Sequence, residues 1–555
     1  MSTLKPKLFT TLKDYTKEQF FKDITAGIIV AIIALPLSIA LAISSGVSPE
    51  KGLYTAIIAG FLTSLLGGSR VLIGGPTGAF MVVVYGIVTK YGVDGLIMAT
   101  LMAGVILVLM GLLRLGGIIK YIPYPITIGF TSGIALTIFS SQIKDFFGLK
   151  IGEVPVEFIG KWKAYFHAGN TIDIQTTIIG IIALLIIILW PKINKKIPGA
   201  LIALIVTSAI VKGFNLEVAT IGSKFGEISS SLPSPQLPAF DLNKIPLLIG
   251  PAITIAVLGA IESLLAAVVS DGMIGGKHRS NMELIAQGVA NMGSALFGGI
   301  PATGAIARTV ANIKNGGRTP VAGMVHAITL LLILVIFMPL AKMIPLTALA
   351  AILIIVAYNM SEWREFKELF KSPKSDIMIL LVTFLITVFI DLVKAIELGM
   401  VLSAFLFMKR MSDVANVNSV NLDAAEEDEK EYFDFEEESK KLKTSKNVRI
   451  YEINGPFFFG AADKFVEVLS GLGDTTKILI IRMRNVPSMD ATALHAFKRM
   501  ITMCKRHKIK ILISGINEQP KSVLKKAAVY DLVGEENFFN NIENAINYSS
   551  KADEN

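Results

Sequence analysis

Long apolar runs recur through the first three quarters of the chain. ITAGIIVAIIALPLSIALAI (24–43), TIIGIIALLIIILW (177–190) and IMILLVTFLITVFI (377–390) contain no charged residue. A helix of about 20 apolar residues spans the hydrocarbon core of a bilayer. The pattern predicts a polytopic α-helical membrane domain over residues 24–412, with about 14 apolar segments, two of them too short to cross the bilayer as continuous helices.

The two short segments follow breaks rich in glycine and proline. GGSRVLIGGPTGAF (67–80) and GGIPATGAI (298–306) both place Gly-Gly, then Pro, then Thr-Gly-Ala before a short apolar run. A helix that begins inside the membrane leaves its first N–H groups without intrahelical acceptors, which is costly in hydrocarbon. Those groups and the positive end of the helix dipole favour an anion. The breaks therefore predict two half-helices that hold an anion mainly through backbone groups.

The same breaks indicate an internal duplication. Thr77 and Thr303 lie 226 positions apart (303 − 77), and Ser38 and Ser263, in similar upstream segments, lie 225 apart (263 − 38). Each half would hold seven segments, an odd number, so the second half enters the membrane from the opposite side. This is the inverted repeat of many secondary transporters. The predicted repeats cover residues 24–213 and 246–412.

Two charged residues lie inside the apolar segments that surround the breaks. Arg308 follows Gly304 by one helical turn, and Glu262 lies in LGAIESLLAAVVSD (258–271). Charges at membrane depth are costly and usually mark transport pathways. We expect Arg308 to add positive potential behind the anion, the alternative being that it pairs with a carboxylate or backbone carbonyls. Burial favours the protonated form of a carboxyl group, so Glu262 is a candidate for coupling to H⁺, or else simply pairs with Arg308 or a hydroxyl.

Charge outside the membrane domain indicates topology. The chain carries a formal net charge of +9, but its lysines concentrate before the first apolar segment and in short loops on one predicted side. The positive-inside rule then places residues 1–23 in the cytoplasm. We expect a transporter rather than an enzyme, with no cofactor, no metal and no nucleic-acid partner. The single cysteine, Cys504, excludes an intrachain disulfide.

The composition changes abruptly after the membrane domain. Residues 413–446 include EEDEKEYFDFEEESKK and predict a solvated acidic linker. Over residues 447–548, runs such as VRIYEING, KILIIRM and IKILISGI predict strands, while ADKFVEVLSGL (462–472) and MDATALHAFKRMITMCKRH (489–507) predict helices. Strands that alternate with helices in this way predict a compact α/β domain, followed by a tail at 549–555.

Several of these stretches resemble the sulfate permease (SulP) family, whose relatives include the animal anion exchangers and prestin and bacterial bicarbonate and dicarboxylate transporters. The stretches are LPLSIALAISSGVSPEKGLY (35–54), GGSRVLIGGPTGAF and ELIAQGVANMGSALFGGIPATGAIARTVAN (283–312). LIIRMRNVPSMDATALHAF (479–497) is similar to the STAS domain that follows the membrane domain in this family. The resemblance implies two inverted sets of seven segments, a gate and a mobile core domain, an elevator-like movement, and a homodimer in the bacterial inner membrane with both termini cytoplasmic.

The resemblance also implies where the anion binds and which ion drives its transport. The positions that match the family's anion site are Leu37, Leu41, Thr77, Gly78, Ala79, Gly304, Ala305, Ile306 and Ala307, with Arg308 behind them. Sodium-coupled bicarbonate members carry an aspartate where this chain has Glu262 and a hydroxyl where it has Ala266. Since Na⁺ needs several oxygen ligands, the resemblance favours H⁺-coupled symport, with Na⁺-coupled bicarbonate uptake as the alternative.

The soluble domain raises a question of regulation. It resembles anti-sigma-factor antagonists in which a serine at a strand-to-helix junction is phosphorylated, and Thr492 occupies that position. A phosphate there would be favoured by the helix dipole, whereas the alternative is that Thr492 only packs while Asp490 caps the helix. The partners expected are a small anion (sulfate, bicarbonate or a dicarboxylate), membrane lipid, a second copy of the chain, and a cytoplasmic protein bound by the STAS domain. A membrane-anchored regulator with vestigial transport is the alternative of another class, and the retained buried charges argue against it.

Overall fold

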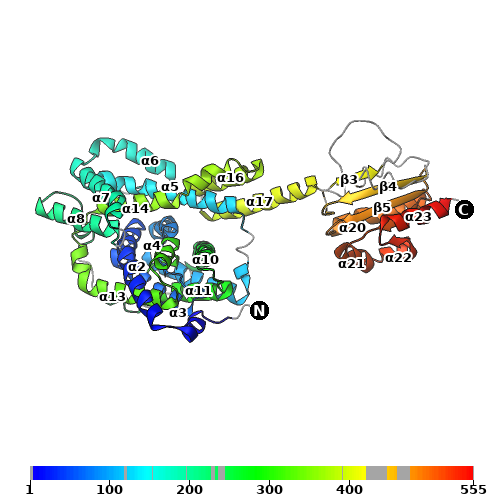
Figure 1. Ribbon diagram of the computed structural model, residues 1–555. Coiled ribbons are helices and arrows are strands. Elements are labelled where there is room, and N and C mark those ends of the chain that lie inside the picture. Colours follow the sequence, from blue (N-terminus) through cyan, green and yellow to red (C-terminus); the bar gives the residue numbers. More distant parts are fainter. Residues whose placement is uncertain are drawn as a thin grey trace. The chain divides into compact units, whose positions relative to one another are not determined.

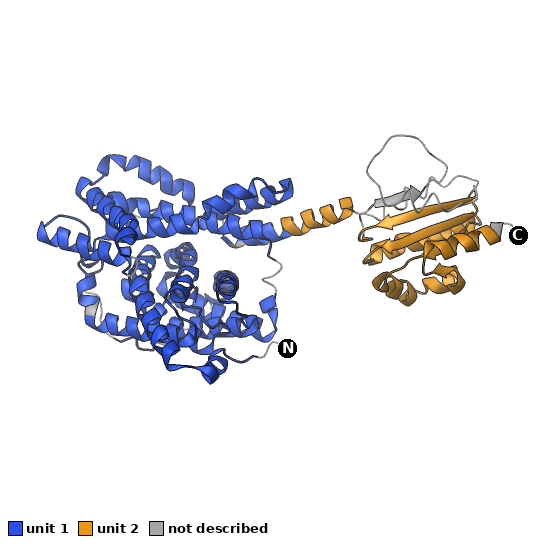
Figure 2. Cartoon of the chain, viewed as in Figure 1, with its two compact units in different colours: residues 1–401 blue, residues 402–555 orange. Residues whose placement is uncertain are grey.

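The computed structural model describes residues 4–117, 122–152, 154–194, 197–226, 232–235, 244–390, 392–414, 416–420, 447–458, 460, 465 and 476–553. The chain forms two compact units, Met1–Val401 and Leu402–Asn555 (Figures 1 and 2). The acidic run from residue 421 to 446 and most of the helix predicted at 462–472 lie outside the described residues.

The first unit is built of helices. Those of its first half are α1 (Leu8–Thr11), α2 (Lys17–Ser44), α3 (Pro49–Leu66), α4 (Gly78–Leu112), α5 (Tyr124–Phe147), α6 (Phe158–His167), α7 (Ile174–Ile193), α8 (Gly199–Gly213) and α9 (Ile221–Phe225). They are followed by α10 (Ile245–Ile274), α11 (Ser280–Leu296), α12 (Ile306–Lys314), α13 (Pro320–Ala341), α14 (Leu346–Met360), α15 (Trp363–Leu369), α16 (Lys374–Phe389) and α17 (Leu392–Val414). Within the described part of the chain, 6 helices are long and apolar enough to cross a membrane by length and composition.

The helices pack into two groups (Figure 1). Helices α2, α3, α4, α10, α11 and α13 form one group, in which α4 packs along α10 and α11, and α13 along α2 and α3. Helices α5, α7, α14 and α16 form the other, centred on α5 and α14. Close approach within the first group depends on glycine: a Cβ added at Gly104 of α4 would lie 2.7 Å from the carbonyl oxygen of Gly288 in α11. Small residues at such contacts let membrane helices approach closely.

Both breaks predicted from the sequence are present in the structure. Strand β1 (Gly74–Gly75) pairs antiparallel with β2 (Thr303–Gly304), so the two breaks lie side by side. Helix α4 starts after β1 and is interrupted at Gly92, which has a positive φ of 72°. Helix α12 starts after β2 and has 9 residues. The segments that follow the breaks are therefore short helices, as predicted, and their starts are held next to each other.

The second unit is a five-stranded sheet with helices on both faces. The strand order is β3 (Asn416–Val420), β4 (Val448–Asn454), β5 (Ile478–Asn485), β6 (Lys510–Ser514) and β7 (Phe538–Phe539). Strand β3 is antiparallel to β4 and the other pairs are parallel. Helices α20 (Ala491–Arg506), α21 (Glu518–Lys526) and α22 (Val529–Val533) cover one face, and α23 (Ile542–Asp553) covers the other.

The sheet explains both a success and an error of the sequence analysis. The first four residues of β5 are apolar because Leu479 and Ile481 pack on one face of the sheet and Ile478 and Ile480 on the other. Strand β3, however, lies inside the segment predicted as linker. Its five residues pair with the backbone of β4, and the acidic composition of residues 413–446 as a whole concealed them.

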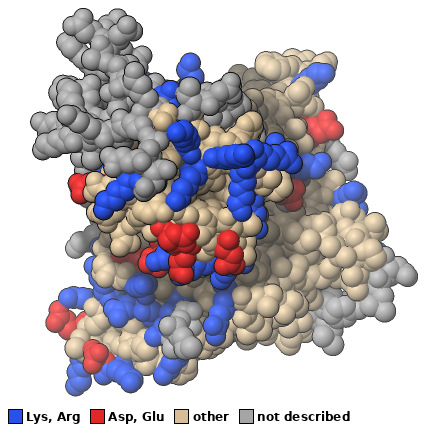
Figure 3. Space-filling view, turned by 90° about the vertical axis from the view of Figure 1, so that its right-hand side faces the viewer, with Lys and Arg blue, Asp and Glu red and all other residues tan. Residues whose placement is uncertain are grey.

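Part of the positive charge lies in the second unit rather than in membrane loops. The last turn of α20 carries Lys505 and Arg506, and that of α21 carries Lys525 and Lys526. Cations are favoured at these positions because the C-terminal end of the helix dipole is negative. On the face drawn in Figure 3, Lys and Arg side chains are interspersed with Asp and Glu. Residues 402–555 carry 22 Lys and Arg against 23 Asp and Glu, so these helix-end cations are balanced by acidic residues and the net positive charge lies in the first unit.

Candidate functional site

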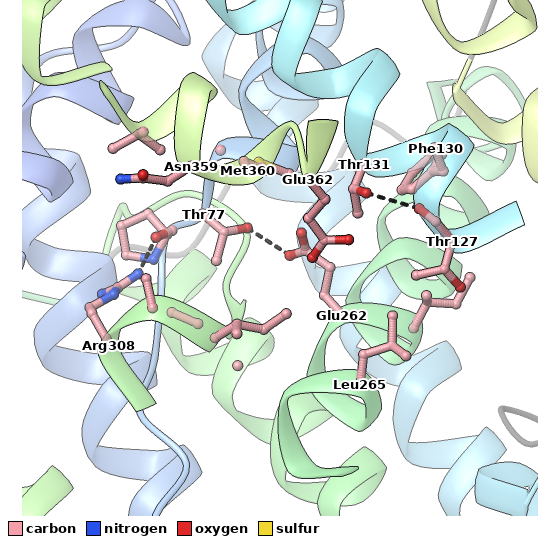
Figure 4. A pocket seen from close by; sticks show the side chains of 18 of the residues that line it. Thr77, Thr127, Phe130, Thr131, Glu262, Leu265, Arg308, Asn359, Met360 and Glu362 are labelled. Carbon is pink, nitrogen blue, oxygen red and sulfur yellow. Dashed lines mark hydrogen bonds between the residues drawn. The ribbon is translucent and has the colours of Figure 1, made fainter. Parts of the chain in front are cut away.

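A cavity of about 280 Å³ lies where the starts of α4 and α12 meet α2, α5, α10 and α14 (Figure 4). Every predicted site residue except Ala79 lines it: Leu37, Leu41, Thr77, Gly78, Glu262, Gly304, Ala305, Ile306, Ala307 and Arg308. Ala79 has no exposed surface and packs in the core of the first unit. The structure thus brings together residues from four separate stretches of sequence in one cavity.

Two helix starts face this cavity with their backbone. Thr77 is the N-cap of α4 and Ala305 that of α12, and no side chain caps either helix. The starts are tied together by the β1–β2 pair and by the Ala305 N–H, which donates to the Ile73 carbonyl at 2.9 Å. The first N–H groups of a helix have no intrahelical acceptor, so both starts present free donors and positive dipole ends at the cavity.

Arg308 is buried beside the first helix start, with 3% of its surface exposed. Its Nη2 donates to the carbonyl oxygen of Pro76, so pairing with a backbone carbonyl, one of the two alternatives for this residue, is observed. Its Nη1 has no hydrogen-bond partner among the described residues. Gly75 makes room for the guanidinium, because a side chain at that position would collide with it. One half of the guanidinium therefore joins the two breaks, and the other half remains available.

Glu262 connects α10 to the start of α4. Its carboxylate accepts a hydrogen bond of 2.8 Å from the Thr77 hydroxyl (Figure 4), and these two described residues, Glu262 and Arg308, form no ion pair with each other. The adjacent Ser263 supports the other break: its hydroxyl lies 2.6 Å from that of Thr303 and accepts from the Gly304 N–H at 3.0 Å. Helix α10 therefore positions both breaks, and Glu262 lines the cavity while bonded to a hydroxyl.

The sequence analysis missed the opposite wall of the cavity. It is formed by Thr127, Phe130 and Thr131 of α5, Asn359 and Met360 of α14, and Glu362 (Figure 4). The two threonines are one turn apart in an otherwise apolar segment, which was an available signal for a polar helix face. Glu362 has a positive φ of 44° at the start of α15, a conformation that sequence does not reveal for a glutamate.

The surroundings of Glu262 offer few ligands for a cation. Ala266, which stands where sodium-coupled relatives carry a hydroxyl, is buried and does not line the cavity. No group of three or more His, Cys, Asp or Glu side chains that could hold a metal ion occurs in the described ranges of the chain. The oxygen that contacts Glu262 is the Thr77 hydroxyl.

In the second unit, the helix that begins near Thr492 is capped by Asp490, as the alternative to phosphorylation of Thr492 predicted. Asp490 is the N-cap of α20, and its side chain accepts from the Ala493 N–H at 2.8 Å. Thr492 is exposed in the first turn of that helix. The capping role of Asp490 is confirmed, and phosphorylation of Thr492 stays a prediction.

Both units of the chain match known protein families. Residues 20–383 match the Sulfate permease family, and residues 439–545 match the STAS domain. The chain is 42% identical over 529 residues to YvdB of Bacillus subtilis (strain 168), covering 95% of this chain and 97% of that protein. It is 30% identical over 528 residues to the bicarbonate transporter BicA of Picosynechococcus sp. (strain ATCC 27264 / PCC 7002 / PR-6), covering 92% and 91%. The fold is similar to the overall structure of SLC26A9, with a TM-score of 0.87 at 18% identity, covering 99% of this chain and 93% of that one.

Proposed function

Because the chain belongs to the sulfate permease family, we propose that it is a secondary active transporter of a small inorganic or carboxylate anion. Sulfate, bicarbonate and a short dicarboxylate are the candidate substrates. The observation that carries the proposal is the pair of uncapped helix starts that face one cavity, with Arg308 beside them. Backbone N–H groups and a buried guanidinium attract an anion by charge and size.

Coupling to H⁺ is assigned to Glu262. In the ionised form its carboxylate accepts the Thr77 hydroxyl hydrogen bond. Protonation turns the carboxyl into a donor and releases the Thr77 hydroxyl, which lines the same cavity, to donate to an anion. Proton and anion binding would then favour each other. Na⁺-coupled bicarbonate uptake is the weaker alternative, since Ala266 supplies no oxygen and does not face the cavity.

Movement of the anion is assigned to sliding of the two helix groups. The half-helix starts, Glu262 and Arg308 all belong to the group around α4 and α10, whereas Thr127, Thr131 and Asn359 belong to the group around α5 and α14. A rigid displacement of the first group would carry the bound anion with it, as in an elevator mechanism. We further propose a homodimer in the bacterial inner membrane with both termini cytoplasmic, and a STAS domain that binds a cytoplasmic protein.

The test is uptake into proteoliposomes that contain the purified full-length chain. Radiolabelled sulfate, bicarbonate and fumarate are supplied under an imposed H⁺ or Na⁺ gradient. We expect one of them to accumulate under an inward H⁺ gradient, and Glu262→Gln to abolish that dependence. Accumulation driven only by Na⁺ would replace the coupling assignment, and no uptake of any of the three would refute the substrate class.

Glu283→Gln is the matched control for the coupling test. Glu283 is a second buried carboxylate, on α11, where it accepts from the N–H groups of Gly68 and Ser69 at 2.8 and 2.9 Å. It does not line the cavity. We expect Glu283→Gln to lower thermal stability and to leave the H⁺ dependence of uptake intact.

A further inference from the structure

A second cavity lies further along the interface between the two helix groups; this interface, which also holds the first cavity, is called the seam below. It has a volume of about 260 Å³ and shares no lining residue with the first cavity. Its walls continue along the same helices: Ser44 lies one turn beyond Leu41 on α2, Met81 one turn beyond Gly78 on α4, and Ser141 ten residues beyond Thr131 on α5. Helix α6 closes it. The two cavities therefore lie in series along the seam.

Two polar side chains of α6 face this second cavity without partners. Lys161 and Tyr165 lie one turn apart, line the cavity, and are 6% and 5% exposed. The Tyr165 hydroxyl is fully buried without a hydrogen-bond partner among the described residues. The Lys161 side chain is buried, but its ammonium keeps some exposed surface and makes no hydrogen bond or ion pair with a described residue. Burying an unpaired donor costs free energy comparable to a lost hydrogen bond, and an unpaired charge costs more. Two such groups on one helix face indicate a ligand that accepts from both.

The remaining charges of the cavity favour an anion. Lys144 and Lys224 line it in addition to Lys161, and Asp145 is its one acidic lining residue among those described. The Lys144 ammonium donates to the Gly152 carbonyl at 2.9 Å, so it is fixed at the rim. Burial lowers the pKa of Lys161 and raises that of Tyr165, so the tyrosine remains a neutral donor. A bound anion would offset the cost of burying the ammonium.

The second cavity also has a route to the surface. A larger, more polar cavity of about 870 Å³ shares Lys144, Asp145 and Lys224 with it. By the count of apolar segments, we expect residues 143–170 on the side opposite to the N-terminus, which the positive-inside rule places in the cytoplasm. The shared lysines would draw anions from that side toward Lys161.

We propose that this second cavity is an outer capture site for a small tetrahedral or planar oxyanion, which accepts hydrogen bonds from Lys161 and Tyr165 before it reaches the half-helix site. Its place in the transport path rests on the proposed function. Its ability to bind an oxyanion does not.

The test compares Lys161→Met with Lys163→Met in the full-length protein. Lys163 is exposed on the same helix and does not line the cavity, so it matches the charge change without touching the site. Sulfate uptake is measured in right-side-out and inverted membrane vesicles. We expect Lys161→Met to raise the apparent KM for the outer face roughly three- to tenfold, with a smaller change for the inner face. Without a gradient the net flux is zero, so a substitution must change Vmax/KM equally for the two directions of transport. The difference between the outer and inner faces is therefore measured in KM itself.

Two further variants keep the test decisive. Lys161→Arg retains the charge and should restore the outer KM, whereas Tyr165→Phe removes one donor at nearly constant shape and should raise it. An outer KM unchanged in both Lys161→Met and Tyr165→Phe would overturn the proposal, as would an equal effect of Lys163→Met. If Lys161→Met does not fold, Tyr165→Phe carries the test alone.

A binding measurement separates this proposal from the transport function. Sulfate should raise the thermal unfolding temperature of the purified protein, and part of that shift should be lost in Lys161→Met or Tyr165→Phe but kept in Lys163→Met. If the protein transports no anion, this dependence on Lys161 should persist. A sulfate-induced shift that is identical in all variants would refute the outer site even when transport is intact.

Discussion

Replacing Arg308 with methionine tests whether the positive charge beside the helix starts contributes to anion binding. Methionine keeps much of the volume of the arginine side chain and removes its charge. The guanidinium donates to the Pro76 carbonyl with one nitrogen and has a second nitrogen free of partners in the described structure. The substitution therefore removes a cation that lines the cavity together with one hydrogen bond at its edge.

The size of the effect follows from the cavity. A sphere of about 280 Å³ has a radius of roughly 4 Å. An anion at its centre then lies roughly 7 Å from the charge centre of a lining guanidinium, and at an effective dielectric constant of about 20 the Coulomb attraction at that distance is about 2 kcal/mol. That free energy corresponds to about a 30-fold change in Kd. Arg308→Lys keeps the charge with fewer donors, and we expect it to lose only a small part of this affinity.

The assay is the concentration dependence of initial sulfate uptake into proteoliposomes, with size-exclusion chromatography of each variant as the check on folding. Arg308→Met should raise the apparent KM far more than Arg308→Lys. If Arg308→Met elutes as a folded protein and its KM stays within about twofold of the wild type, Arg308 only joins the two breaks and the electrostatic argument is wrong.

Three further outcomes are expected. Asp23 is buried and accepts hydrogen bonds from the Thr319 hydroxyl at 2.6 Å and the Arg318 N–H at 2.9 Å. Asp23→Ala should therefore lower the free energy of unfolding by about 2 kcal/mol or more, measured as a lower thermal unfolding temperature. An unchanged temperature would show that this contact between α2 and α13 is dispensable. Asp490→Ala should cost about 1 kcal/mol through loss of the α20 cap, whereas Thr492→Ala, as control, should cost little. Burial raises the pKa of Cys504 to about 11, so an aromatic disulfide reagent should leave it unmodified at neutral pH in the folded protein and react once per chain in denaturant; rapid reaction in the native state would contradict its burial. Because the folded state keeps this proton while the unfolded state loses it near pH 9, the thiol should lower stability as pH rises from about 9 toward 11.

The sequence predicted one side of the cavity well because that side is made of backbone. Glycines, prolines and the order Thr-Gly-Ala mark a helix start directly, and two such marks at a common offset locate both starts. The antiparallel pairing of Gly74 with Gly304 then follows from two breaks that meet in space. Arg308 and Glu262 were found because a charge stands out in an apolar run.

Apart from the threonines of α5, the opposite side of the cavity could not be predicted from the sequence, for a physical reason. Phe130 and Met360 are ordinary residues for a membrane helix, and only the packing of α5 against α14 directs them toward the half-helices. The hydrogen bond from Thr77 to Glu262 likewise depends on how α10 crosses the start of α4. Side-chain partners between distant segments are set by packing, which residue periodicity does not specify.

The predicted duplication fits a site with two similar backbone ends, whereas the charged lining residues Glu262, Arg308 and Glu362 all lie in the second predicted repeat. The offset of 225 that relates Ser38 to Ser263 also relates Leu37 to Glu262 (262 − 37 = 225), and both of these residues line the cavity. A carboxylate at position 37 would place a further negative charge beside a bound anion, in addition to Glu262 and Glu362, whereas leucine adds none. The first predicted repeat lines the cavity with apolar and hydroxyl side chains, among them Leu37, Leu41, Thr77 and Thr131. We infer that both predicted repeats contribute a backbone helix start to the proposed anion site, whereas its charged side chains come from the second repeat alone.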